Sequence, residues 1–99
     1  MNQRFELGRI VATPGALDVL GEHNVSPSEL VERHASGNWG EVPAADAREN
    51  QYSVKHGFRK HGFRILSSYP LGNDGSSAKV WIVTEADKSS TCLLLPSEY

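Results

Sequence analysis

The stretch Lys79-Val-Trp-Ile-Val-Thr-Glu85 decides the fold, because it has the pattern of a central strand in a small sheet. Its alternate residues form two sets, and both sets are largely apolar, as expected for a strand that is covered on both faces. Phe63–Tyr69 and Thr91–Leu95 show the same enrichment in β-branched, aromatic and aliphatic residues, and turn-forming residues bound each stretch. The sequence therefore predicts a three-stranded antiparallel meander near the C-terminus.

The first helix is expected directly after a short apolar run. Leu7–Ala12 has the composition of a strand, and Thr13-Pro14 then combines an N-cap residue with a proline at the first helical position. Leu17 falls on the expected inner face, and Gly21 marks the expected end of this helix. Whether Leu7–Ala12 joins the sheet is left open by the sequence.

The second helix has the strongest local signals. Ser26 and Glu29 have the spacing of a reciprocal capping box, and the helix is expected to run to about Ala35. Gly37 is placed for a left-handed C-terminal cap. Good helix formers and early acidic residues predict a third helix that opens at about residue 43 and reaches about residue 54.

These elements predict an α+β fold formed by a single domain over residues 1–99. Two to three N-terminal helices would pack on the C-terminal meander, and the short N-terminal strand is a further candidate member of the sheet. Ninety-nine residues suffice for one two-layered core but not for a deeply enclosed active site.

The composition excludes several classes of protein. Ten basic and twelve acidic residues give a net charge of −2, which argues against binding duplex DNA by bulk charge. The single cysteine, Cys92, cannot form an internal disulfide. No apolar run approaches the length of a membrane span. We therefore expect a cytoplasmic protein without a membrane partner.

A perfect tandem repeat supplies the only basic cluster. Lys55-His-Gly-Phe-Arg59 is followed at once by Lys60-His-Gly-Phe-Arg64. Cations interleaved with aromatic rings are a plausible footprint for single-stranded nucleic acid, because lysine and arginine hold phosphates while rings stack on bases. The alternative is a solvated loop whose phenylalanines belong to the core.

Two further segments are candidates for binding. Trp39, held between glycines, is either a lid on the core or an exposed recognition residue. The turn Thr84–Thr91 gathers carboxylates, an ammonium group and hydroxyls, and forms either a capped hairpin loop or a polar rim. The candidate binding residues are Trp39, Glu41, Arg59, Arg64, Tyr69, Glu85, Asp87 and Lys88.

An enzymatic alternative uses part of the same set. Glu85 as base, Arg64 (or Arg59) as oxyanion or phosphate support and His61 (or His56) as acid would form a metal-free ribonuclease site. In layout and residue type this looks like the barnase and RelE-type toxin ribonucleases. His56 and His61 are five residues apart, which is not the spacing of a helical zinc site. No metal and no cofactor are expected.

Several segments spread over the chain share a pattern with a known group. They are Leu7–Leu17, Arg33-His34, Gly37–Gly40, Asn50, Arg64–Tyr69, Lys79–Thr91 and Leu94–Tyr99. In these segments nearly the whole chain resembles small uncharacterised bacterial proteins of plasmids, integrative elements and prophages, labelled plasmid-related or as a type I restriction subunit. It departs from that group at Lys88, where Arg is expected, and in the doubled repeat, where a single short passage is expected.

The resemblance implies the biological context of the protein but not a chemical mechanism. It suggests an accessory protein of mobile DNA that acts on host defence or on element maintenance. The leading hypothesis is a non-enzymatic binding module for a protein partner or a single-stranded nucleic acid, and the ribonuclease toxin or an inactive relative is the alternative. Thr91–Leu95, with leucines on both faces, is also a candidate edge strand and hence a homodimer seam.

Overall fold

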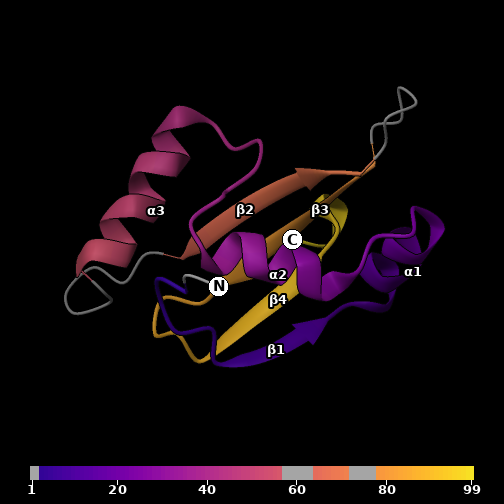
Figure 1. Cartoon of the computed structure of the whole chain (residues 1–99), viewed down its shortest axis with the longest axis horizontal. Coiled ribbons are helices and arrows are strands. Elements are labelled where there is room, and N and C mark those ends of the chain that lie inside the picture. The colour runs from indigo at the N-terminus through magenta and orange to yellow at the C-terminus, as the bar shows by residue number, and fades with distance from the viewer. Residues whose placement is uncertain (1–2, 57–63, 72–77) are drawn as a thin grey trace.

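The computed structural model describes residues 3–56, 64–71 and 78–99, and it has the predicted α+β layout (Figure 1). Helices and strands follow in the order β1 (Arg9–Ala12), α1 (Pro14–Glu22), α2 (Pro27–Ala35), α3 (Ala44–His56), β2 (Ile65–Pro70), β3 (Lys79–Thr84), β4 (Ser90–Leu94) and the 3-10 helix η1 (Pro96–Glu98). The strands form one four-stranded sheet in the order β1-β4-β3-β2.

The predicted meander is confirmed, and its register divides the sheet into two faces. β3 is central and pairs antiparallel with β2 and with β4. Ile82, for example, lies opposite Ser67 on one side and Leu93 on the other. The face that carries Ile82 is called the helix face, because α1 and α2 pack on it, and the opposite face is called the outer face.

The short N-terminal strand joins the sheet at an unexpected place. β1 pairs in parallel with β4, in the register Ile10↔Thr91. β4 is therefore an interior strand, and the expectation that Thr91–Leu95 forms an exposed dimer seam is wrong. The two edges of the sheet are β1 and β2.

The main core lies between the helix face and the two N-terminal helices. Its buried members come from α1, α2 and three strands, because each of these elements presents apolar residues toward this layer. The cluster comprises Ala16, Leu20, Leu30, Val31, Tyr69, Val80, Ile82 and Leu93. Leu17, which was expected on the inner face of α1, is 48% exposed instead.

Most of the predicted helix caps are formed in the structure. The Thr13 hydroxyl accepts a hydrogen bond of 3.0 Å from the Ala16 amide, as expected of an N-cap. The capping box at Ser26 is not formed, since the Ser26 hydroxyl bonds to Ser28 instead. Gly37 has a φ of +91° and ends α2 with its amide bonded to the His34 carbonyl, as predicted for a left-handed cap.

The free edge of β2 is covered by other parts of the same chain. The buried Asn50 side chain from α3 bonds both backbone groups of Leu66, accepting from its amide at 3.0 Å and donating to its carbonyl at 2.7 Å. Two residues later, the Ser68 amide donates to the Trp39 carbonyl and the Ser68 carbonyl accepts from the Glu41 amide. An amide side chain and a connector thus take the place of a fifth strand along β2.

Gly40 allows the connector to approach β2 so closely. It has a φ of +71° and forms an isolated bridge with Ser68. A Cβ atom at this position would overlap the Ser68 carbonyl. Glycine is therefore required here for both its backbone conformation and its size.

Candidate binding surface

Trp39 is part of the core. Its side chain is 6% exposed, and its ring lies 6.1 Å from Phe5 and 5.9 Å from His34, measured between ring centroids. The interpretation of Trp39 as a lid on the core is thus confirmed. The alternative, an exposed recognition residue, is wrong because almost none of the indole reaches the surface.

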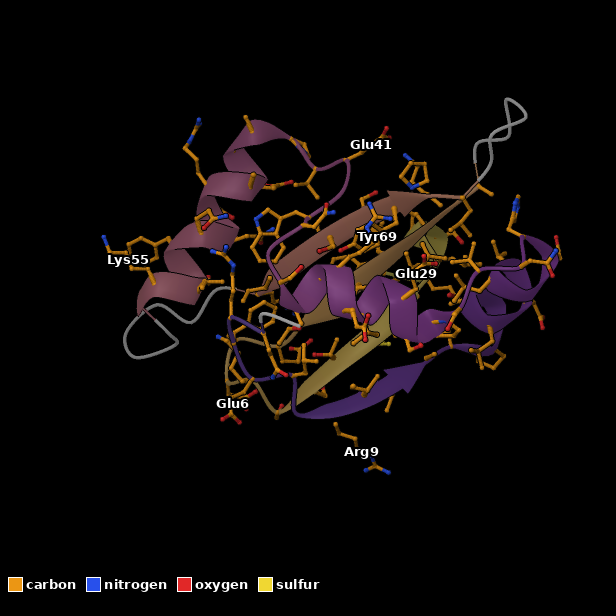
Figure 2. All side chains as sticks on the ribbon, viewed as in Figure 1. Glu6, Arg9, Glu29, Glu41, Lys55 and Tyr69 are labelled. Atoms are coloured by element: carbon orange, nitrogen blue, oxygen red, sulfur yellow. The ribbon has the colours of Figure 1, made fainter. Side chains whose placement is uncertain are left out.

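Tyr69 is also a core residue, although it was expected to contribute to binding. It is fully buried, its hydroxyl donates to the Asn38 carbonyl at 2.5 Å, and the Arg33 guanidinium lies 4.6 Å from its ring centroid. Burial raises the pKa of Tyr69 above its ordinary value. Figure 2 shows Tyr69 between the sheet and α2, whereas Glu41 projects into solvent near β2. Tyr69 therefore anchors the connector after α2 and leaves no surface for a partner.

Two of the predicted residues do meet on the surface. Arg64 and Glu85 flank the paired ends of β2 and β3, and Arg64 Nε lies 3.7 Å from Glu85 Oε1. Both side chains are about half exposed. The Arg64 guanidinium also donates to the Tyr99 hydroxyl and lies 5.5 Å from the Tyr99 ring centroid. Arg64 is thus held in place by an acid and an aromatic ring together.

Trp81 and Tyr99, neither of which was predicted to bind a partner, complete this group. Their ring centroids are 5.6 Å apart with an interplanar angle of 67°, an edge-to-face contact. Tyr99 is 61% exposed. The signal for Trp81 was present in the alternation of β3, which places it on the outer face, away from the helices. We call Arg64, Trp81, Glu85 and Tyr99 the outer-face cluster.

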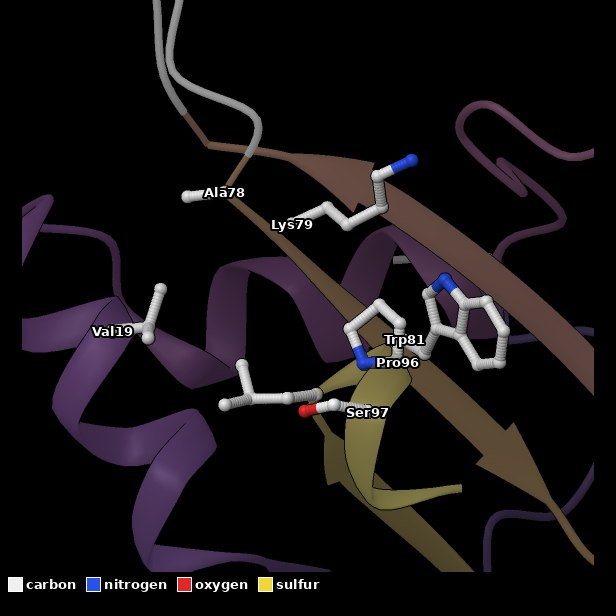
Figure 3. Close-up of a pocket in the computed structure, with 7 residues that line it drawn as sticks. Val19, Ala78, Lys79, Trp81, Pro96 and Ser97 are labelled. Atoms are coloured by element: carbon white, nitrogen blue, oxygen red, sulfur yellow. The ribbon is translucent and has the colours of Figure 1, made fainter.

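A groove lies on the other side of Trp81 (Figure 3). It has a volume of about 500 Å³, and α1, the start of β3 and η1 contribute its walls. The lining residues are Val19, Ala78, Lys79, Trp81, Leu95, Pro96 and Ser97. Apart from Lys79 and Ser97 this lining is apolar, so the groove suits an apolar group with a polar or charged neighbour.

The turn after β3 is a well-capped hairpin loop. Asp87 Oδ1 accepts from the Ser89 amide at 2.9 Å, and hydrogen bonds from Ser89 lower the pKa of Asp87. The Lys88 ammonium donates to the Ala86 carbonyl at 3.2 Å. Since the loop's own backbone occupies these groups, the capped-loop alternative accounts for both residues.

A buried chain of hydrogen bonds runs from α2 through the sheet, and its direction can be derived. The Thr91 hydroxyl donates to the Leu7 carbonyl, which can only accept. Thr91 must therefore accept from the Thr84 hydroxyl at 2.7 Å, and Thr84 in turn accepts from His34 Nε2 at 2.9 Å. His34 Nδ1 is left to accept from the Ser67 hydroxyl at 2.6 Å.

This direction places a proton on Nε2 of His34, and burial keeps the imidazole neutral, so Nδ1 is the acceptor. His34, Ser67, Thr84 and Thr91 are all fully buried, and burial lowers the pKa of His34 to about 3. The group resembles a Ser-His pair in composition only, because no substrate can reach it. Its role is to tie α2 to three strands and to the N-terminal segment.

The remaining predicted site residues lie outside the described residues. Arg59 and His61 fall between residues 57 and 63, so only Glu85 and Arg64 of the ribonuclease set are placed. Within the described ranges no three His, Cys, Asp or Glu side chains come together as a metal site. In the same ranges no helix has the length and hydropathy needed to cross a membrane.

Comparison with known proteins adds no relative to this picture. No protein-family model, no curated protein and no solved structure matches the chain. The candidate site therefore rests on the geometry of the outer-face cluster and the adjoining groove.

Proposed function

We propose that the chain is a non-enzymatic binding module that takes a segment of a protein partner in the groove beside Trp81. The observation that carries this proposal is the position of Trp81, which forms one wall of the groove and also belongs to the outer-face cluster. A partly buried indole that lines an apolar hollow and packs against an aromatic ring held by an ordered arginine is typical of a binding hot spot.

The charges favour a protein over a nucleic acid. The Arg64 guanidinium is paired with Glu85, and the carboxylate beside it disfavours the approach of a nucleic-acid backbone. The chain as a whole carries a net charge of −2. Lys79, at the rim of the apolar groove, suits a single carboxylate. The best occupant is therefore an aromatic or aliphatic side chain next to an acidic residue.

The setting of this activity follows from the resemblance to proteins of mobile elements. An accessory protein of a plasmid or prophage gains from binding a host defence protein or a maintenance factor in the cytoplasm. A small rigid module that masks a short apolar and acidic segment would serve either purpose without an active site of its own.

The two tryptophans provide the test, because one is buried and the other lines the groove. Peptide display on the immobilised protein should enrich sequences that join an apolar anchor to Asp or Glu. In an ¹⁵N-HSQC titration with such a peptide, the Trp81 indole resonance should shift while that of Trp39 stays in place.

Three variants make this test specific. Trp81→Ala and Lys79→Glu should each weaken binding of the selected peptide by about tenfold or more. Tyr52→Ala, a change of an aromatic residue that is 46% exposed on α3, should leave the affinity unchanged. Enrichment that survives Trp81→Ala, or retention of nucleic acid instead of peptide, would contradict the proposal.

The Arg64–Glu85 contact also favours a second candidate, the metal-free ribonuclease. In that case Glu85 would act as the base and Arg64 would stabilise developing negative charge on phosphate. Purified protein should then cleave single-stranded RNA without added metal, and Glu85→Gln should abolish the cleavage. Equal activity of the two proteins would remove this candidate.

A further inference from the structure

The two edges of the sheet differ in how they are protected. Asn50 and the connector at Trp39–Glu41 cover the backbone groups of β2. No described residue covers β1 in the same way. An uncovered edge strand is a template for pairing with another strand.

The register of β1 shows which of its backbone groups are available. The amides of Arg9 and Thr13 donate to the carbonyls of Ser89 and Leu93 in the segment of β4. In a parallel ladder this places the N–H and C=O groups of alternate residues on the inner side. The N–H and C=O groups of Ile10 and Ala12 therefore point away from the sheet.

The side chains at this edge are apolar and exposed. Ile10 is 51% exposed on the helix face, and Val11 is 40% exposed on the outer face. An edge strand usually carries charges or proline at such positions to prevent association. Here the charge is confined to Arg9, which projects from the edge into solvent (Figure 2).

We propose that β1 pairs antiparallel with β1 of a second copy, about a two-fold axis through Val11. Ile10 of each protomer would then form a hydrogen-bonded pair with Ala12 of its partner, using the four outward N–H and C=O groups on each side. Val11 would face Val11 across the axis on the outer face. The result is one continuous eight-stranded sheet.

Charge complementarity favours this register and a second copy as the occupant. It places Arg9 of one protomer opposite Thr13 of the other. The Thr13 hydroxyl donates to Glu98 Oε1 at 2.7 Å, so a carboxylate stands beside that position. Hydrogen bonds from Leu95 and Thr13 lower the pKa of Glu98. The Arg9 guanidinium of each protomer thus lies beside Glu98 of the partner, which gives two such contacts per dimer.

Charge substitutions at Val11, on the two-fold axis, test the dimer. The result is independent of the proposed function, because the dimer does not involve the groove beside Trp81. Light scattering coupled to size exclusion should give the wild-type protein a concentration-dependent mass that rises toward twice 10.9 kDa. Val11→Lys and Val11→Glu, each alone, should remain monomeric at every concentration because like charges meet on the axis. An equimolar mixture of the two variants should recover the dimer.

Cross-linking tests the register. Val11→Cys should form an intermolecular disulfide on oxidation, because non-hydrogen-bonded pairs bring Cα atoms within about 4.5 Å. The experiment needs the Cys92→Ala background, since Cys92 is the partner of Val11 within the same protomer. Ile10→Cys in that background is the matched control and should not cross-link.

Several outcomes would overturn the proposal. A wild-type protein that stays monomeric at all concentrations excludes the dimer. Single Val11 variants that dimerise as the wild type does place the seam elsewhere. Cross-linking through Ile10→Cys rather than Val11→Cys shows a register centred on Ile10, in which Arg9 no longer faces Thr13. Circular dichroism spectra that match the wild type show that the variants remain folded.

Discussion

Ser67 and His34 are 33 residues apart in the chain, yet Ser67 Oγ lies 2.6 Å from His34 Nδ1 in the interior. The serine is the donor in this bond, because the Leu7 carbonyl at the opposite end of the same chain of hydrogen bonds places a proton on Nε2, and burial keeps the imidazole neutral. One interaction at the N-terminal segment thus determines which nitrogen of the buried imidazole carries the proton.

Removing the imidazole should destabilise the protein strongly. His34→Ala leaves the Ser67 and Thr84 hydroxyls without their partner and creates a cavity, so we expect a loss of about 3–5 kcal/mol in the free energy of unfolding. His23→Ala, a change of a half-buried histidine at the end of α1, should cost less than about 1 kcal/mol. Urea titration followed by circular dichroism measures both values, and equal costs would contradict a special role for His34.

The stability of the protein should fall as the pH drops below about 6.5. Because burial lowers the pKa of His34 from its ordinary value of 6.5 to about 3, the unfolded chain binds one more proton between these limits. The free energy of unfolding should then decrease by about 1.4 kcal/mol per pH unit in that window. The lowered pKa values of Asp87 and Glu98 contribute only near and below their ordinary values of 3.8 and 4.5.

Among the described residues with a shifted pKa, His34 alone affects stability between pH 6.5 and 5. His34→Gln keeps an amide donor and acceptor but cannot titrate, so its stability should be nearly constant across this window. Urea midpoints measured at several pH values compare the two proteins. A variant that keeps the full slope of the wild type would assign the proton uptake to another group.

The cover of β2 should depend on both halves of one amide. Asn50→Leu removes two hydrogen bonds to Leu66, and we expect a loss of about 2 kcal/mol together with slow aggregation through the opened edge. Asn50→Asp should also destabilise, because a carboxylate cannot donate to the Leu66 carbonyl. Gln51→Leu, at the exposed neighbouring position, is the control. Urea titration and light scattering over time give the two readouts.

Two glycines should respond to alanine in opposite directions. Gly40→Ala places a Cβ atom on the Ser68 carbonyl at a positive φ, so we expect it to cost about 2 kcal/mol or more. Gly21→Ala lies in α1 with no atom within 4 Å of the added Cβ, and it should stabilise the protein by about 0.5 kcal/mol. Thermal melts of both variants check the signs, and a neutral Gly40→Ala would show that the connector can move away from β2.

The sequence predicts those parts of the fold that depend on local patterns. The alternation within Lys79–Thr84 and the caps at Thr13 and Gly37 are properties of adjacent residues, and the structure agrees with them. The pairing of β1 is different, because four residues with a partner at the other end of the chain carry no local signal for a parallel register. That is why β4 was expected at the edge.

The candidate surface was predicted in part for the same reason. Arg64 and Glu85 are brought together by the register of β2 and β3, which the meander already implied. Trp39 and Tyr69 are large, and each lies between one polar residue and a glycine or proline, so composition alone does not distinguish a buried aromatic residue from an exposed one. Asn50 gave no signal for its role, because it depends on where α3 lies beside β2.

Because β1 pairs with β4, the first strand of the chain cannot enter the sheet until the last strand has been synthesised. Leu7 and Thr91, which are hydrogen bonded, are 84 positions apart, so β1 leaves the ribosome long before its partner strand exists. At 5–20 residues per second the interval is about 4–17 s. During that time the meander cannot be completed, and the apolar side chains of Ile10 and Val11 have no strand beside them. The nascent protein must therefore complete its sheet after translation of β4, with its first strand added among the last.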